Sequence, residues 1–262
     1  MTEPAEREHL HAKLDRLGEP EVAVVGRVVD ACLVPVGYDF TNDTWLTAAG
    51  WGEVFQTRIR AHHALNPEPM LTSAFEAAFN AACDAVGWRA VPAPSATHRF
   101  FDTTVTIPGG EPLRISLKSS AARDMKTDRV HISKLTEAAW IQDARTQSAR
   151  RKHIVDLFRD YRATTDLIMM VRCFSIENGG RYQYELVEIP TSLFASVDLV
   201  DIELAQKSTI GIPPGVKPPE AKIRVDRSDA KITLTDIRLD LCVVHGRWTV
   251  ENLSGRELTA EA

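Results

Sequence analysis

The sequence predicts an α/β fold in which helices flank a mixed central β-sheet. Residues 70–86 have helical periodicity, two pairs of β-type runs are joined by glycine-containing turns, and helical spacing returns before Tyr161. The chain has 262 residues, of which 44% are hydrophobic and 26% charged. This composition is ordinary for a globular protein and excludes disorder as the main state. We expect one domain over residues 1–262, because the chain after the proline-containing loop 211–222 is too short for a core of its own.

The first fifth of the chain gives mixed signals. Residues 1–16 are polar and typical of a helix that ends near Leu17-Gly18. Residues 21–37 are rich in valine but contain three helix or strand breakers, so their pattern fixes neither state. Residues 38–51 carry turn-forming Asp, Asn and Gly.

Residues 70–86 are the clearest predicted helix, because apolar side chains recur on one face and Gly87 follows. Ser73 and Glu76 have the spacing of a capping box, in which the glutamate folds back onto the first turn. Two interpretations of Glu76 therefore stay open: a helix cap, or an acid available for chemistry.

The runs Arg99–Ile107 and Leu113–Ser119 flank a Pro-Gly-Gly-Glu turn and predict a β-hairpin. If the turn centres near Gly109, Asp102 faces Ser116 across the ladder. Lys118 lies two residues beyond Ser116, on the same face of its strand, and becomes a diagonal neighbour of Asp102. An aspartate and a lysine that converge in this way can hold a divalent metal and polarise a water molecule.

The second half of the chain is predicted to be mainly sheet after one long helix. The helix is expected to start around Ser133, and its far end shows apolar spacing up to Tyr161. Asn178-Gly179-Gly180 predicts a hairpin. The other expected elements are the strands Asp166–Glu177, Arg181–Ile189, Lys222–Val225 and Leu239–His245, and a helix after Pro190.

The charge of the chain is unevenly distributed. The net charge is −5, which argues against a protein that coats nucleic acid nonspecifically, yet residues 114–162 hold twelve Lys/Arg against six Asp/Glu. Such a stretch either is a solvated face or contacts DNA, since arginine pairs bidentately with guanine. The candidate DNA contacts are Ser116, His131, Lys134, Arg145, Arg150, Arg151 and Lys152.

Some classes of protein are excluded by what the sequence lacks. No apolar run approaches the length of a membrane-spanning helix, and the polar, acidic N-terminus is unlike a signal peptide. We therefore expect a cytoplasmic protein. The four cysteines are far apart, which predicts free thiols rather than disulfides or a zinc site.

The helix with Glu76, the strand with Asp102 and the strand with Lys118 resemble the PD-(D/E)xK nuclease core. In that core a helix acid, a strand aspartate and an x-Lys strand build one metal site. Here Ser116 occupies the position that is acidic in the motif. Some restriction endonucleases with a Ser-x-Lys strand draw the missing carboxylate from the next helix, and Glu137 is the candidate for that role.

Most of the chain resembles type II restriction endonucleases of the SmaI type, a group in which the residue two before the lysine is also not acidic. Six segments in the same order carry the resemblance. They are Ala74–Asn80, the Asp102 strand, Leu117-Lys118 with Ala121-Ala122, His131–Lys134 with Glu137, Tyr184–Pro190 and Cys242–Trp248.

The resemblance implies a restriction-endonuclease-like core and a site-specific double-strand endonuclease of a restriction-modification system. It implies Mg²⁺-dependent hydrolysis by a homodimer at a short, G·C-rich palindrome, leaving 5′-phosphate and 3′-hydroxyl ends. In these terms Asp102 binds the metal, Glu137 or Glu76 supplies a second carboxylate, and Lys118 orients and helps deprotonate the attacking water. A repair or structure-selective nuclease, or a DNA-binding module made inactive by Ser116, are the alternatives.

Overall fold

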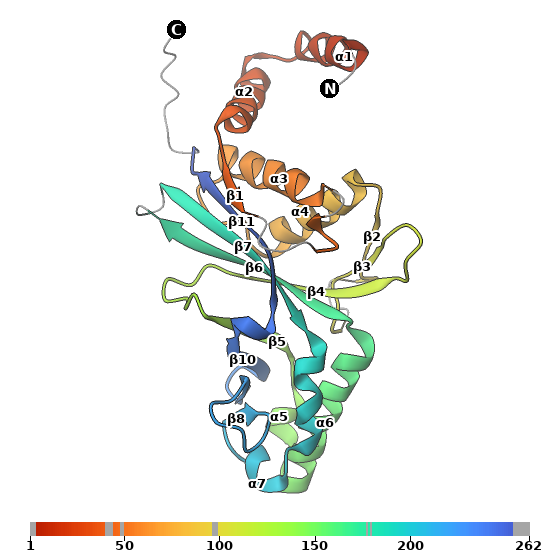
Figure 1. Cartoon of the computed structure of the whole chain (residues 1–262), viewed down its shortest axis with the longest axis vertical. Helices are drawn as coiled ribbons and strands as arrows, with labels where there is room; N and C mark the ends of the chain where they lie inside the picture. Colours follow the sequence, from red (N-terminus) through yellow and green to blue (C-terminus); the bar gives the residue numbers. More distant parts are fainter. Residues whose placement is uncertain are drawn as a thin grey trace.

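Two β-sheets form the framework of the molecule. The computed structural model describes residues 4–39, 44–47, 50–95, 99–176, 178 and 180–253. A seven-stranded sheet crosses the middle, helices cover one of its faces, and a four-stranded sheet with a long helix covers the other (Figure 1). The predicted α/β class, a mixed sheet flanked by helices, is confirmed.

The seven-stranded sheet is antiparallel except for one central pair. Its order is β1-β11-β7-β6-β4-β3-β2, and β4 runs parallel to β6. The strands are β1 (Gly37–Asp39), β2 (Arg89–Pro92), β3 (Thr103–Thr106), β4 (Leu113–Ser120), β6 (Leu167–Ile176), β7 (Arg181–Pro190) and β11 (Val243–Glu251).

The second sheet is fully antiparallel, in the order β5-β10-β9-β8. Its strands are β5 (Arg129–Glu137), β8 (Thr209–Ile212), β9 (Ala221–Asp226) and β10 (Lys231–Arg238). The chain enters it directly from β4, through the loop 121–128. This sheet therefore adjoins the end of the strand that carries Lys118.

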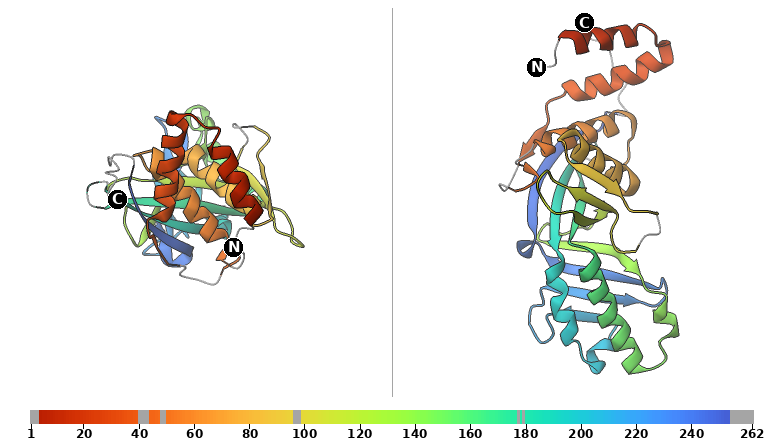
Figure 2. Two further views of the ribbon diagram at one scale, coloured as in Figure 1. Left: turned by 90° about the horizontal axis from the view of Figure 1, so that it is seen from above. Right: turned by 90° about the vertical axis from the view of Figure 1, so that its right-hand side faces the viewer.

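The helices are divided between the two sides of the large sheet. On one side lie α3 (Trp51–Leu65) and α4 (Thr72–Ala85), with α1 (Pro4–Leu14) and α2 (Glu19–Leu33) projecting beyond them (Figure 2). On the other side are α5 (Trp140–Asp143), α6 (Gln147–Thr164), the 3₁₀ helices η3 (Thr191–Leu199) and η4 (Leu239–Leu241), and α7 (Ile202–Ala205). Among the described residues, no helix is long and apolar enough to cross a membrane.

Each face of the large sheet is buried in its own hydrophobic core. The side chains of β6 alternate between the two: Met169 and Val171 pack with α3 and α4, whereas Ile168 and Met170 pack with α6 and the second sheet. Because both faces are covered, β6 reads as a nearly continuous apolar run, as expected for a central strand with a parallel neighbour.

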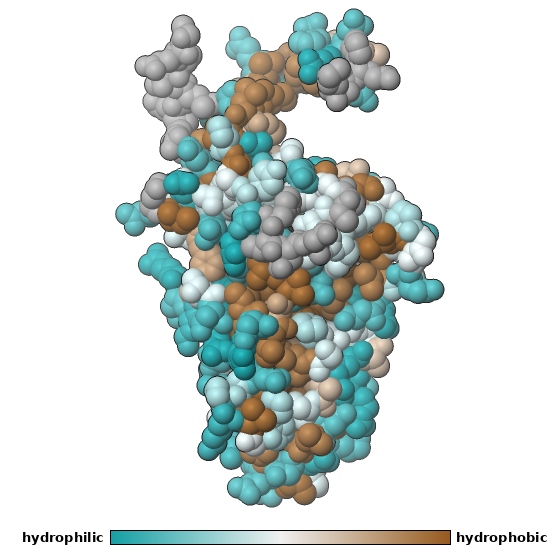
Figure 3. All heavy atoms as spheres, viewed as in Figure 1, coloured by the Kyte–Doolittle hydropathy of each residue, from teal (hydrophilic) through white to brown (hydrophobic). Residues whose placement is uncertain are grey.

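Residues 21–37, which the sequence leaves open, are mostly the helix α2. Pro20, the second residue of this helix, favours the helix start, because its missing amide donor would have no partner there. The helix packs on α3 and leaves several large apolar side chains exposed, which contribute to the apolar patch near the top of Figure 3. These side chains are Val22, Val24, Val29 and Leu33.

Both predicted hairpins are confirmed. Thr103 pairs with Ile115 and Val105 with Leu113, which is the register expected around Gly109. The second hairpin pairs Ile176 with Arg181; two of its turn positions, 177 and 179, lie outside the described residues. A helix after Pro190 is also confirmed, as the 3₁₀ helix η3.

Two predicted elements are wrong. The helix expected from Ser133 is the strand β5, because Ile132 pairs with Leu234 and Glu137 with Lys231 of β10; helical structure returns only at Trp140. The stretch expected as the strand Leu239–His245 begins as the 3₁₀ helix η4 and becomes strand β11 at Val243. Strand β10 was not among the predicted elements.

Candidate active site at the edge of strand β4

The site lies where β4 extends beyond the end of its neighbour β3. The last ladder pair joins Thr103 to Ile115, and the amide of Asp102 then donates to the carbonyl of Ile115 at 2.9 Å. Beyond this point the carboxylate of Asp102 replaces the missing strand: its Oδ2 accepts a hydrogen bond from the amide of Leu117 at 2.6 Å. The sheet edge therefore fixes the orientation of the carboxylate.

Asp102 and Lys118 meet at this edge. The Nζ of Lys118 lies 3.5 Å from Oδ2 of Asp102, and the hydroxyl of Ser116 donates to the same oxygen at 3.3 Å. The diagonal proximity of Asp102 and Lys118 expected from the hairpin register is thus confirmed. The side chains of Asp102 and Lys118 are about one-third and one-fifth exposed, so solvent and a ligand can reach both.

Glu76 faces the same pocket from α4. Burial, followed by the negative charge of Asp102, raises the pKa of the Glu76 carboxyl, while Lys118 opposes the rise. The capping-box interpretation is wrong, because Leu71 is the N-cap of α4 and no side chain caps the helix. The carboxylate of Glu76 therefore does not cap the helix, and it lines the pocket instead.

The pocket has a volume of about 240 Å³. It lies between the N-terminal part of α4, the edge of β4 and the middle of β5. It is lined by Thr72, Phe75, Glu76, Asp102, Leu117, Lys118, Ser119, Ile132, Ser133 and Lys134. Ser119 also binds the start of α4, since its hydroxyl accepts from the amide of Thr72 at 2.9 Å.

Glu137 does not belong to this group in the structure. It ends the strand β5 rather than starting a helix, its side chain is 80% exposed, and it forms an ion pair with Lys134 at 2.8 Å. The hydrogen bond from Lys134 lowers the pKa of the Glu137 carboxyl. Of the two candidates for the second carboxylate, Glu76 lines the pocket and Glu137 lies outside its lining.

The donor set suits a hard divalent cation that shares its shell with a substrate. No cluster of three or more His, Cys, Asp or Glu that could hold a metal occurs in the described part of the chain. Two carboxylates, Asp102 and Glu76, do face one pocket, where burial and, after it, the charge of Asp102 raise the pKa of Glu76. Mg²⁺ is commonly held by one or two carboxylates together with water and substrate phosphates, so these residues fit it.

The candidate DNA contacts are placed very differently from one another. Ser116 is fully buried, and its hydroxyl donates a hydrogen bond to the carboxylate of Asp102. Arg150 is also buried and donates to the carbonyls of Ala205 and Lys207, and Arg151 donates to that of Val200. These hydrogen bonds give all three residues a structural role within the fold, and their assignment as DNA contacts stays a prediction.

The other four candidates are exposed. Arg145 precedes α6, and Lys152 on that helix pairs with Asp156 one turn later. Lys134 lines the active-site pocket, whereas His131 lines a neighbouring pocket beside the loop 121–128. Only Lys134 and His131, therefore, are shown to lie next to the pockets at β4 and β5.

Several polar residues of this region have no signal in the sequence. Lys126 and Asp236 pair across 110 positions at 3.4 Å, and the buried Arg172 binds Glu185 at 2.7 Å. Tyr161 lies beneath Ser116, and burial raises the pKa of its hydroxyl. Tyr161 lies in a predicted helix and Glu185 in a predicted strand, but no sequence signal places them beside Ser116 and Arg172, so only the fold brings these contacts together.

Comparisons with known proteins agree with this geometry. The family described as SmaI: Type II site-specific deoxyribonuclease matches residues 21–250. The type II restriction enzyme SmaI of Serratia marcescens is 24% identical over 207 residues, which cover 75% of this chain and 78% of that enzyme. No solved structure matches the chain significantly.

The mixed sheet, with an acid and a lysine side by side at the edge of β4, is compatible with a restriction-endonuclease-like core. The family match covers most of the chain, and it identifies the class of protein as a type II site-specific deoxyribonuclease. The chain belongs to the SmaI family of type II site-specific deoxyribonucleases. It is accordingly a restriction endonuclease that acts on DNA.

Proposed function

We propose that this restriction endonuclease hydrolyses both strands of a short, G·C-rich palindrome in the presence of Mg²⁺, on a PD-(D/E)xK core, and leaves 5′-phosphate and 3′-hydroxyl ends. The observation that supports it most directly is the convergence of Asp102 and Lys118 at 3.5 Å, with Glu76 on the same pocket. This geometry argues against the alternative of an inactive DNA-binding module, because replacing an acid by Ser116 leaves the pair intact.

Asp102 and Glu76 would hold the metal in this proposal. When bound, Mg²⁺ supplies positive charge that stabilises the transition state of phosphoryl transfer. Asp102 is well suited as a ligand because the Leu117 amide and the Ser116 hydroxyl fix one of its oxygens. Glu76 must lose its proton to take part, and its raised pKa makes that step depend on pH.

Lys118 would act on the attacking water. Its ammonium group can orient the water, favour loss of the water proton to solvent by stabilising the resulting negative charge, and offset the negative charge that develops on the phosphate oxygens. The water oxygen bonds to phosphorus as its proton passes to solvent, the bond to the 3′-oxygen breaks, and that oxygen takes up a proton from solvent. The phosphate then remains on the 5′ end.

We also propose that the active form is a homodimer, because symmetric cleavage of a palindrome needs two related active sites. Light scattering with and without duplex DNA tests this. A protein that cuts both strands of a palindrome while it remains monomeric on DNA would contradict it.

Cleavage of plasmid DNA tests the whole proposal. With Mg²⁺ the protein should produce discrete fragments, and sequencing their ends gives both the recognition site and the stagger. Lys118→Ala should abolish cleavage but keep DNA binding in Ca²⁺, whereas Glu137→Gln, which changes an exposed acid outside the pocket, is the matched control and should cut normally. Full activity of Lys118→Ala, or cuts that follow lesions instead of a sequence, would overturn the proposal.

A further inference from the structure

A second pocket adjoins the active site. It has a volume of about 240 Å³ and lies between the loop 121–128, the start of β5 and the end of β10. It is lined by Ser120, Ala122, Asp124, Met125, Lys126, Arg129, Val130, His131 and Asp236. The two pockets are neighbours along both strands that they share: Ser119 lines the active-site pocket and Ser120 this one on β4, and His131 lines this pocket and Ile132 the active-site pocket on β5. DNA at the active site can extend over this pocket, since its major groove is about 12 Å wide.

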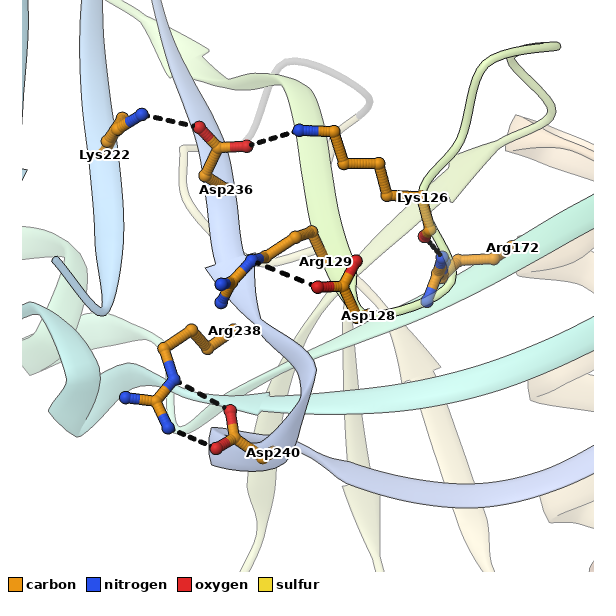
Figure 4. A network of polar contacts seen from close by, with 8 residues as sticks. All are labelled: Lys126, Asp128, Arg129, Arg172, Lys222, Asp236, Arg238 and Asp240. Carbon is orange, nitrogen blue, oxygen red and sulfur yellow. Dashed lines mark hydrogen bonds and ion pairs between the residues drawn. The ribbon is translucent and has the colours of Figure 1, made fainter. Parts of the chain in front are cut away.

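Asp236 lies at the centre of a charged cluster beside this pocket (Figure 4). Its carboxylate lies 2.8 Å from Nζ of Lys222 and 3.4 Å from Nζ of Lys126. The register of β10 with β5 shifts between Leu234 and Ile237, and Asp236 has a φ of 53°, in the left-handed region. Such a bulge redirects a side chain away from the regular alternation of the strand.

The loop that carries Lys126 is anchored from below. Arg172 of β6 donates to the carbonyl of Lys126 and is itself paired, fully buried, with Glu185 of β7 at 2.7 Å. Figure 4 shows Arg172 meeting the loop at Lys126, while the lysine side chain extends toward Asp236. The donor and the acceptor are thus held in place by two different sheets.

The charges of this cluster suit a base pair better than a phosphate. A surface that binds only phosphate gains nothing from a carboxylate, which repels the DNA backbone. Here Asp236 offers an acceptor and Lys126 offers donors side by side. In the major groove a G·C pair presents the complementary set: the N7 and O6 acceptors of guanine and the N4 amino donor of cytosine.

We propose that Asp236 and Lys126 read one G·C pair of the recognition site in the major groove. Asp236 accepts a hydrogen bond from the N4 amino group of cytosine, and Lys126 donates to O6 or N7 of guanine. Lys222 remains paired with Asp236 and keeps its carboxylate ionised and oriented. This inference rests on the proposed function, since it assigns part of the sequence preference to named side chains.

Selection of bound duplexes from a randomised library, in Ca²⁺, tests the proposal without requiring cleavage. The proteins compared are the wild type, Asp236→Asn and Lys126→Gln, with Asp229→Asn as the control. Asp229 is an exposed acid in the turn between β9 and β10 that pairs with Lys231 and lies outside the pocket. Lys126 is two-thirds exposed, so Lys126→Gln tests the idea even where Asp236→Asn disturbs the bulge.

The expected result is a loss of preference at one G·C pair in each half-site. For Asp236→Asn and Lys126→Gln, discrimination against A·T at that pair should fall about 10- to 100-fold, and the other positions and the control should be unchanged. Weaker binding of all sequences alike, or an unchanged consensus, would overturn the proposal. Cleavage of the selected site by the wild type with Mg²⁺ is scored separately, so the proposed reaction can fail without affecting this result.

Discussion

The buried pair of Arg172 and Glu185 should be among the most sensitive points of the fold. Their side chains are 1% and 5% exposed, with 2.7 Å between Nη1 and Oε2. Burial lowers the pKa of Arg172, and Glu185 opposes that effect. Removing one member leaves a charge in the interior, which typically costs about 3 to 5 kcal/mol of unfolding free energy.

The two single substitutions should not be equal. In Arg172→Met, Glu185 still has Arg247, whose Nη2 lies 2.8 Å from its other oxygen. In Glu185→Gln, Arg172 keeps the Lys126 carbonyl and the ring of Phe174, but among the described residues it pairs with no other carboxylate. We therefore expect Glu185→Gln to cost about 4 kcal/mol and Arg172→Met about 1 to 2 kcal/mol less.

Urea unfolding followed by far-ultraviolet circular dichroism measures these differences. The double variant Arg172→Met with Glu185→Gln should be more stable than the sum of the single changes predicts, since no unpaired charge stays buried. Single costs below about 1 kcal/mol, or fully additive values, would refute the reasoning, because the pair would then behave like an exposed ion pair.

Other predictions concern the active site and the core. Glu76→Gln should stabilise the protein at neutral pH and weaken its binding of divalent metals. The pKa of Glu76 is higher in the folded than in the unfolded state, so this carboxyl stabilises the fold only at low pH, and the contribution is lost as the pH rises through the folded-state pKa. For the same reason, when the pH is lowered, metal binding by the wild type should begin to weaken at a higher pH than it would with a glutamate of ordinary pKa. Calorimetry at a series of pH values measures this. Ser116→Ala should cost about 1 kcal/mol and keep cleavage, whereas Ser116→Asp should destabilise the protein because it buries a second acid against Asp102. Burial lowers the pKa of His63 to about 4, so stability should be complete above pH 6.5 and fall by about 3 kcal/mol toward pH 4; His63→Gln should flatten that dependence in pH-resolved unfolding.

Local signals predicted the part of the site that depends on one hairpin. A short turn fixes the register of its two strands, so the placement of Asp102 opposite Ser116, and of Lys118 one diagonal away, follows from the residues around Gly109. The sequence could not decide between the two interpretations of Glu76, because the choice depends on where α4 begins relative to β4. In the structure α4 begins after the N-cap residue Leu71 without a side-chain cap, and this start excludes the capping box.

The sequence is wrong, undecided or uninformative where distant segments decide the structure. The partner of β5 is β10, about a hundred residues later, and bulges in both strands break the alternation that would have predicted β5 as a strand. Residues 21–37 have β-branched composition, but α2 is stabilised by its contact with α3. Arg150 and Arg151 look like a basic surface in the sequence, yet their guanidinium groups bind backbone carbonyls of a segment some fifty positions away.

The direct passage from β4 through the loop 121–128 into β5 limits how this enzyme could be retargeted. A second sheet joined by a long linker could be exchanged without affecting the cutting centre. Here the residues after Lys118 lead within one short loop into that sheet, and Ile132, Ser133 and Lys134 of β5 also line the active-site pocket. An engineered graft on the second sheet would therefore have to keep the geometry of β5, or it would displace one wall of the active-site pocket.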